Sequence, residues 1–120
     1  MEKKTVVLGA SMNPGRYSYL AVKKLAAYKH PVVAIGKRKG NIGNIEIKTD
    51  HVAEENVDTV TLYLNSQNQR EYYDYILNLK PARIIFNPGT ENDELVQKAK
   101  EHGIEPVEAC TLVMLSIGAY

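Results

Sequence analysis

Residues 6–18 read VVLGASMNPGRYS, an uncharged apolar run that leads into small and turn-forming residues and then into an arginine. This order predicts a buried strand, a tight turn and the start of a helix. The first amides of a helix lack intrahelical acceptors, and the helix dipole adds positive charge there, so such a junction suits an anion. We therefore expect the backbone amides from Gly9 onward to bind phosphate, with Arg16 as a forked donor.

Composition predicts one globular domain over residues 1–120. The chain is 44% hydrophobic and 24% charged, within the ordinary range of such domains. The single Cys110 has no partner for an internal disulfide and no apolar leader precedes the first strand, so a cytoplasmic location is expected. A net charge of +1 disfavours a nucleic-acid partner. The longest uncharged apolar stretch, 111–119, is far shorter than the roughly 18 residues of a membrane span.

Strand and helix patterns alternate along the chain. Strands are predicted at 5–8, 32–35, 59–64, 83–86 and 104–107, with a short edge fragment at 45–47. Helices are predicted from Pro14 to before His30, from Ser66 to about Leu79, before Gly103, and over a last turn or two at 111–117. Ser66 and Gln69 have the spacing of a capping box. This alternation indicates a single-domain α/β fold, Rossmann-like and three-layered, with a mostly parallel sheet of about five strands.

In such sheets ligands bind at the carboxyl ends of the strands, where the strand order reverses. That rule brings five turns around one predicted crevice: residues 9–16, 36–39, 65–67, 87–92 and 108–110. The crevice is therefore the expected binding site.

The residues in these turns narrow the class of ligand. A Walker loop is excluded because Gly15 is followed by Arg16 and Tyr17 rather than by lysine and a hydroxyl residue. The dinucleotide fingerprint is also absent, since Ser11 occupies its second glycine position. After the second strand, an NAD site carries an acidic residue, whereas this chain has Lys37 and Arg38. Cations there favour a ribose that carries a phosphate, as in coenzyme A (CoA) or NADP.

Several motifs together resemble one family, the small stand-alone CoA-binding domain proteins, which are similar to the nucleotide-binding domain of the succinyl-CoA synthetase alpha subunit. The motifs are VLGAS-x-NP-x-R-x-S at 7–18, PV-x-x-I-x at 31–36, VDTV at 57–60 and NPGTEN at 87–92, followed by a late Cys110. The resemblance covers nearly the whole chain. It implies a Rossmann-like fold that binds CoA or an acyl-CoA.

The resemblance also implies roles for particular residues. The diphosphate site would be lined by Gly9, Ala10, Ser11, Asn13, Pro14 and Arg16, with Ser18 adding a hydroxyl. Lys37 and Arg38, which follow Gly36, would meet the adenosine end and its 3′-phosphate. Asn65, Asn87, Pro88 and Gly89 would flank the nucleotide or the pantetheine arm. The chain departs from many relatives at two places: Gly36-Lys37 replaces Asn-Pro, and Phe86 to Gly89 replaces an aromatic-x-Gln-x-Gly pattern.

No catalytic or metal-binding constellation is evident. The three histidines are far apart in sequence, and no two carboxylates have the spacing of an acid and base pair. Cys110 precedes an apolar run, which indicates packing. We therefore expect non-catalytic binding of CoA or an acyl-CoA. The alternatives are an NADP-binding redox or regulatory protein, and an interaction module that has lost its ligand. Tyr72, Tyr73 and Tyr75 on one helix indicate a partner surface or a homodimer contact.

Overall fold

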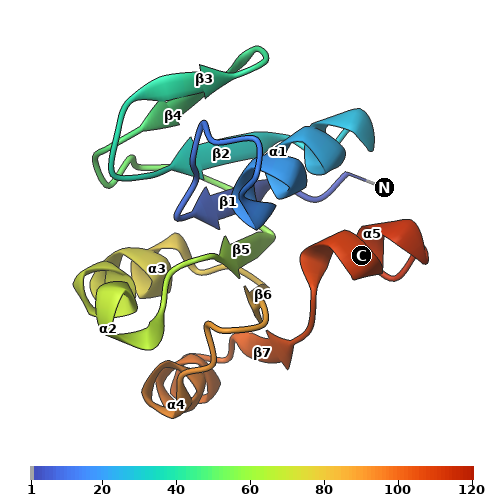
Figure 1. The fold of residues 1–120 in the computed structure, drawn as a ribbon. Helices are drawn as coiled ribbons and strands as arrows, with labels where there is room; N and C mark the ends of the chain where they lie inside the picture. The colour runs from blue at the N-terminus through green and yellow to red at the C-terminus, as the bar shows by residue number, and fades with distance from the viewer. Residues whose placement is uncertain (1) are drawn as a thin grey trace.

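The computed structural model describes residues 2–120 and has three layers (Figure 1). A central sheet carries α1 (Tyr17–Ala27) and α5 (Thr111–Ser116) on one face. The other face is covered by α2 (Ser66–Gln69), α3 (Tyr73–Leu79) and α4 (Asp93–Glu101), with a 3₁₀ turn, η1 (Arg70–Tyr72), joining the first two. This architecture confirms the predicted Rossmann-like α/β fold. Within residues 2–120, no helix is both long and apolar enough to cross a bilayer.

The sheet has seven strands in the order β3-β4-β2-β1-β5-β6-β7. Their bounds are β1 Thr5–Leu8, β2 Val32–Ile35, β3 Gly40–Ile42, β4 Ile45–Lys48, β5 Thr59–Leu62, β6 Arg83–Phe86 and β7 Glu105–Glu108. Every neighbouring pair is parallel except β3 and β4. The chain places β2 on one side of β1 and β5 on the other, so the strand order reverses at β1. The carboxyl end of β1 is therefore the expected position of a ligand site.

β1 is the centre of the core. All four of its residues are buried, and its first residue, Thr5, pairs with Val32 of β2 and with Thr59 of β5. Val6 and Leu8 belong to the apolar cluster under α3 and α4, whereas Val7 belongs to the cluster under α1. Since both faces are covered, Val6 to Leu8 form a continuous apolar run rather than an alternating pattern.

The hairpin at one edge of the sheet raises the strand count above the predicted five. β3 and β4 are joined by the two-residue loop 43–44, in which Gly43 adopts a φ of +59°. Gly-Asn is a recognised signal for such a loop, but Ile42 is the only buried residue of β3, so its apolar pattern is weak. The fragment predicted at 45–47 is β4, which lies between β3 and β2 rather than at the edge.

One predicted helix start and one predicted helix cap are wrong. α1 begins at Tyr17 because Pro14 and Gly15 form a turn, in which the amide of Arg16 donates to the carbonyl of Asn13 at 3.0 Å. The segment 66–79 is capped by Asn65, whose Oδ1 accepts from the amide of Asn68 at 2.8 Å. Gln69, the second member of the predicted capping box, is fully buried instead.

The structure does not show the partner surface predicted at three tyrosines. Tyr72 and Tyr75 are buried, and the ring of His51 lies 4.7 Å and 5.1 Å from theirs. The hydroxyl of Tyr75 donates to the carbonyl of Val52 at 2.6 Å. Tyr73, which is half-buried, donates to the carboxylate of Glu94 at 2.9 Å. These tyrosines are therefore used in contacts within the fold.

Candidate functional site

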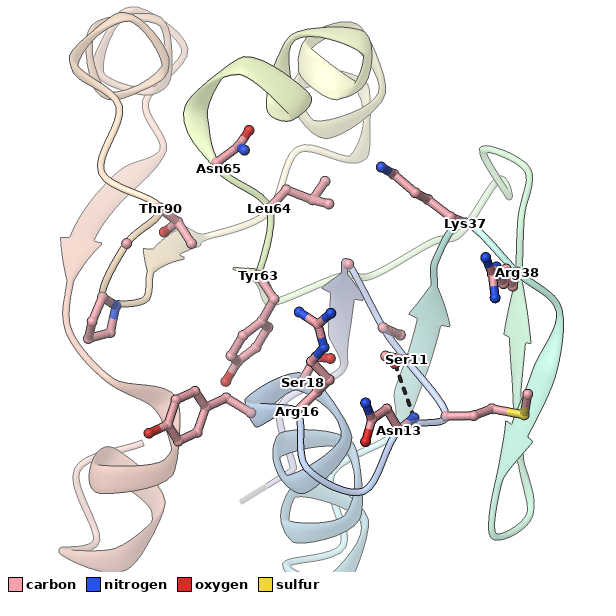
Figure 2. Close-up of a pocket in the computed structure, with 16 residues that line it drawn as sticks. Ser11, Asn13, Arg16, Ser18, Lys37, Arg38, Tyr63, Leu64, Asn65 and Thr90 are labelled. Atoms are coloured by element: carbon pink, nitrogen blue, oxygen red, sulfur yellow. Dashed lines mark hydrogen bonds between the residues drawn. The ribbon is translucent and has the colours of Figure 1, made fainter.

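A cavity of about 860 Å³ opens at the carboxyl edge of the sheet, where the strand order reverses (Figure 2). Its volume lies within the roughly 300–1,000 Å³ of small-molecule sites. The lining comes from the β1–α1 connection, the loop after β2 and the segments after β5 and β6. It comprises Gly9, Ala10, Ser11, Met12, Asn13, Arg16, Tyr17, Ser18, Lys37, Arg38, Tyr63, Leu64, Asn65, Pro88, Gly89 and Thr90.

The β1–α1 connection begins with two amides that are already bonded. The amides of Gly9 and Ala10 both donate to the carbonyl of Ile35 at 2.9 Å, so they are not free to bind an anion. The expectation that the amides from Gly9 onward bind phosphate is therefore wrong for Gly9 and Ala10. Gly9 has another role, because its φ is +94° and an added Cβ would lie 2.9 Å from the backbone of Tyr63. It allows β1 to end tightly against the segment after β5.

The next part of the connection is shaped by its own side chains. The hydroxyl of Ser11 accepts from the amide of Asn13 at 3.0 Å, and Oδ1 of Asn13 accepts from the amide of Gly15 at 2.9 Å (Figure 2 shows the first bond). These bonds hold the turn in shape and lead it into α1.

The free amides begin at Ser11 and continue into the start of α1. Between Gly9 and Leu20, five backbone amides have no hydrogen-bond acceptor among the described residues: those of Ser11, Met12, Tyr17, Ser18 and Tyr19. The first helical hydrogen bond runs from the amide of Leu20 to the carbonyl of Arg16. The N-terminus of α1 therefore presents unpaired amides and the positive end of the helix dipole. The unpaired amides of the junction therefore lie at Ser11, Met12 and the first turn of α1 rather than at Gly9 and Ala10.

The charged residues that line the cavity are all basic. Arg16, Lys37 and Arg38 line the cavity, and none of the lining residues is acidic. The ion pairs within residues 2–120 lie elsewhere, at Lys4 with Glu54 and at Arg83 with Asp58. In Figure 2, Lys37 and Arg38 lie on the opposite side of the cavity from Tyr63, with Arg16 between. The cavity is thus positive without internal compensation, which favours an anionic ligand.

Three lining residues that were not named as site residues lie outside the turns predicted to surround the crevice: Tyr17, Tyr63 and Leu64. Met12 and Thr90 lie within those turns but were not named as site residues either. Tyr63 and Leu64 were assigned to a strand, but β5 ends at Leu62, so they are the first loop residues at the carboxyl edge. That position was a usable signal, since side chains that directly follow parallel strands face the crevice. Burial raises the pKa of Tyr63, and the phenol is therefore protonated at neutral pH.

Met12 connects the β1–α1 turn to the hairpin. Its thioether lies against Gly40 in β3, so that any side chain at residue 40 would collide with it. This contact brings the edge hairpin, and with it the loop that carries Lys37 and Arg38, against the turn. The absence of a side chain at Gly40 was not interpretable before the fold was known.

Three of the predicted site residues do not reach the cavity. Pro14 lies on the exposed outer side of its turn. Gly36 donates its amide to Lys48, and an added Cβ would lie 2.2 Å from the carbonyl oxygen of Ala10, so it is needed for packing. The remaining predicted residues line the cavity: Gly9, Ala10, Ser11, Asn13, Arg16, Ser18, Lys37, Arg38, Asn65, Pro88 and Gly89.

Asn87 is the third predicted site residue that does not line the cavity, and its role is structural. It is 2% exposed, and its Nδ2 donates to Thr61 at 2.7 Å and to the carbonyl of Leu62 at 2.8 Å. Its Oδ1 accepts from the amide of Thr111 at 2.8 Å. Every polar atom of this side chain is therefore used to join the first residue of α5 to the end of β5.

Cys110 and the histidines lie outside the lining. Cys110 is half-buried at the N-cap of α5, so the predicted approach of 108–110 to the crevice is wrong. His102 ends α4, and its Nδ1 lies 2.8 Å from the carbonyl of Lys98, as expected for an imidazole at a helix end. In the described part of the chain, no three His, Cys, Asp or Glu residues lie close enough together to hold a metal ion.

The fold and the cavity define a Rossmann-like α/β domain with a ligand-sized, positively charged site at its switch point. Comparison with family models gives a match over residues 3–116 to the CoA binding domain. The chain therefore belongs to the CoA-binding domain family. Among curated proteins, none matches it.

Solved structures support the same fold. An uncharacterized protein in a crystal structure is 51% identical, with a TM-score of 0.97 over 100% of this chain and 99% of that one. A hypothetical protein from Pyrococcus horikoshii is 20% identical, with a TM-score of 0.87 over 97% of this chain and 83% of that one. A Thermus thermophilus protein is also 20% identical, with a TM-score of 0.86 over 99% and 91%. The last two similarities concern the fold alone.

Proposed function

We propose that this protein binds CoA or an acyl-CoA in the cavity at the carboxyl edge, without chemistry of its own. The observation that carries the proposal is a cavity whose charged residues are all basic, in a chain that belongs to the CoA-binding domain family. CoA is an anion with phosphate at two places, on the ribose and in the diphosphate. The cavity has cations at two places as well.

The diphosphate is assigned to the first turn of α1. The unpaired amides of Tyr17, Ser18 and Tyr19 can donate to phosphate oxygens, and the hydroxyl of Ser18 and the guanidinium of Arg16 line the same region. Amides, helix dipole and guanidinium act in the same direction here. This assignment keeps Arg16 and Ser18 of the sequence-based set and replaces the amides of Gly9 and Ala10.

The ribose 3′-phosphate is assigned to Lys37 and Arg38. Both are exposed at the end of β2, and neither forms an ion pair within residues 2–120. A carboxylate at this position would repel a phosphorylated ribose, whereas an ammonium and a guanidinium attract it. The same cations fit the phosphorylated ribose of NADP, which makes NADP the second candidate.

The pantetheine arm is assigned to the side of the cavity formed after β5 and β6. Asn65, Pro88, Gly89 and Thr90 line it, together with the ring of Tyr17. Asn65 uses Oδ1 to cap α2, which leaves its amide nitrogen to donate to a ligand carbonyl.

The proposal assigns no catalytic role to the lining, whose charged residues are all basic. Cys110 is a free thiol within the described chain, in keeping with action in a reducing compartment such as the cytoplasm.

Thermal denaturation with a panel of ligands tests the proposal. A ligand at a hundred times its dissociation constant stabilises the protein by about 2.7 kcal/mol, which raises Tm by several degrees. We expect CoA and acetyl-CoA to raise Tm, dephospho-CoA to raise it less, and NAD and ATP to raise it least. A rise with NADP alone would assign the site to NADP, and no rise with any member of the panel would refute nucleotide binding.

A further inference from the structure

A buried glutamine joins the two loops that form one wall of the cavity. Gln69 is 0% exposed, although it lies in a helix that begins at the protein surface. Its Nε2 donates to the carbonyl of Leu64 at 2.8 Å and to the carbonyl of Thr90 at 2.7 Å. Both acceptors belong to residues that line the cavity, one in the segment after β5 and the other in the segment after β6. In Figure 2, Leu64 and Thr90 lie on these two separate segments, on the same side of the cavity.

The amide oxygen of Gln69 is hydrogen-bonded as well. Its Oε1 accepts from Nδ2 of Asn92 at 2.9 Å, so two donors and one acceptor are satisfied within the interior. Asn92 in turn caps α4 through Oδ1, which accepts from the amides of Glu94 and Leu95 at 3.1 Å and 3.2 Å. The second proton of its Nδ2 goes to the hydroxyl of Tyr73 at 2.8 Å. A fully satisfied network of this kind holds one arrangement, because every alternative leaves a buried polar group unpaired.

We propose that Gln69 is a positioning residue of the ligand site, which fixes the separation of the segments 63–65 and 88–90 and thereby the width of the cavity. The inference rests on the proposed function, since it concerns the affinity of that same site. Gln69 does not line the cavity, so it acts through the backbone of Leu64 and Thr90. Segments held in place before binding do not have to be ordered when the ligand arrives, which improves affinity.

Replacement of Gln69 by methionine keeps the length of the side chain and removes all three hydrogen bonds. We expect Gln69→Met to weaken CoA binding about tenfold, the size of effect expected when two loops must be ordered on binding. Isothermal titration, at a temperature where the variant is fully folded, measures this change. Hydrogen exchange of the free protein should be faster at 63–65 and 89–90 and unchanged in β1.

The variant Gln69→Glu provides a second measurement, the pH dependence of CoA affinity, which a loss of stability alone would not change. A protonated carboxyl group can donate to one of the two carbonyls, whereas a carboxylate can donate to neither. Burial beside carbonyl oxygens raises the pKa of such a carboxyl group. The CoA affinity of Gln69→Glu, relative to the wild type at each pH, should therefore improve as the pH falls from about 8 to about 6. Gln69→Met should show no such dependence.

Ile104→Ala is the matched control. Ile104 is 4% exposed and directly precedes β7, at the amino ends of the parallel strands, whereas the cavity lies at their carboxyl ends. Its truncation removes apolar contacts from the core but no hydrogen bond to either loop. We expect its CoA affinity to equal that of the wild type. Wild-type binding together with unchanged affinity in Gln69→Met would refute the positioning role alone. Failure of the wild type to bind CoA would instead refute the proposed function, and with it any role of Gln69 in that site.

Discussion

The need for a glycine at position 36 follows from a single close contact. The end of β2 passes so close to the β1–α1 turn that a Cβ on Gly36 would lie 2.2 Å from the carbonyl oxygen of Ala10. Backbone atoms cannot move aside as the end of a side chain can, so Gly36→Ala should cost about 1–3 kcal/mol of stability, in the range of overpacked cores. Urea unfolding measures this cost. Gly15→Ala is the control, since its Cβ would meet only the side chain of Asn13, at 3.3 Å. Equal stability of Gly36→Ala and the wild type would contradict the close approach.

The proposal assigns the 3′-phosphate of the ligand to Lys37 and Arg38. The double variant Lys37→Ala/Arg38→Ala should weaken CoA binding by at least about tenfold, since charged hydrogen bonds contribute roughly 1.5–3 kcal/mol each. Its affinity for dephospho-CoA, which lacks the 3′-phosphate, should stay close to that of the wild type. Titration calorimetry with both ligands makes the comparison. Arg16→Ala, assigned to the diphosphate, should weaken both ligands alike. Equal losses in the double variant would refute the assignment of the 3′-phosphate.

Tyr75 links stability to alkaline pH. Burial, and then the charges of Glu54 and Asp50, raise the pKa of Tyr75 to about 12. The neutral phenol, which donates to Val52, is therefore favoured by the fold. Its contribution is complete below pH 10, the ordinary pKa, and is lost as the pH rises from 10 to about 12, because the unfolded chain ionises first. The stability difference between wild type and Tyr75→Phe should shrink over that window. A constant difference in urea unfolding would contradict the raised pKa.

At the scale of an element, the start of α2 shows which of two neighbouring residues, Asn65 or Ser66, caps the helix. The sequence pattern indicated Ser66 as the cap, whereas in the structure Asn65 accepts from the amide of Asn68. Asn65→Ala should therefore cost about 1 kcal/mol, the usual effect of removing a cap, and Ser66→Ala much less. Thermal unfolding of the two variants compares them directly. A larger loss in Ser66→Ala would restore the original interpretation.

The strands and helices that the sequence predicted well are those with strong apolar patterns. β1, β2 and β6 match their predicted bounds because a strand buried on both faces leaves a continuous apolar run. The errors fall where local chemistry decides: Pro14 fits a first helical turn as well as a β-turn, and only the bond from Arg16 to Asn13 separates the two. β3 was missed because an edge strand buries little, as its single buried residue Ile42 shows.

The candidate site was predictable in position and less so in atomic detail. The end of β1, the pair Lys37 and Arg38, and Asn65 all line one cavity, because the rule for parallel sheets depends on topology alone. The acceptor of the Gly9 and Ala10 amides could not be predicted, since the carbonyl of Ile35 reaches them only in the folded sheet. Asn87 was misassigned for a related reason: its buried partners come from β5 and α5.

At the scale of the whole molecule, the topology converts these local features into one site. β1 lies between β2 and β5, so the connections that leave these strands diverge and the cavity opens between them. The N-terminus of α1 and the end of β2 meet there, although they lie about 20 residues apart in the sequence, as in other doubly wound sheets. The chain belongs to the CoA-binding domain family, and the positive lining is compatible with an anionic ligand such as CoA.

An NMR titration with CoA tests the account most directly, because it reports on individual backbone amides. The unpaired amides of Tyr17, Ser18 and Tyr19, together with those of Ser11 and Met12, should show the largest saturable shifts. The amides of Gly9 and Ala10, which are bonded to Ile35, should shift less. The account would be contradicted if CoA left the first turn of α1 unchanged, whether or not signals elsewhere in the protein moved.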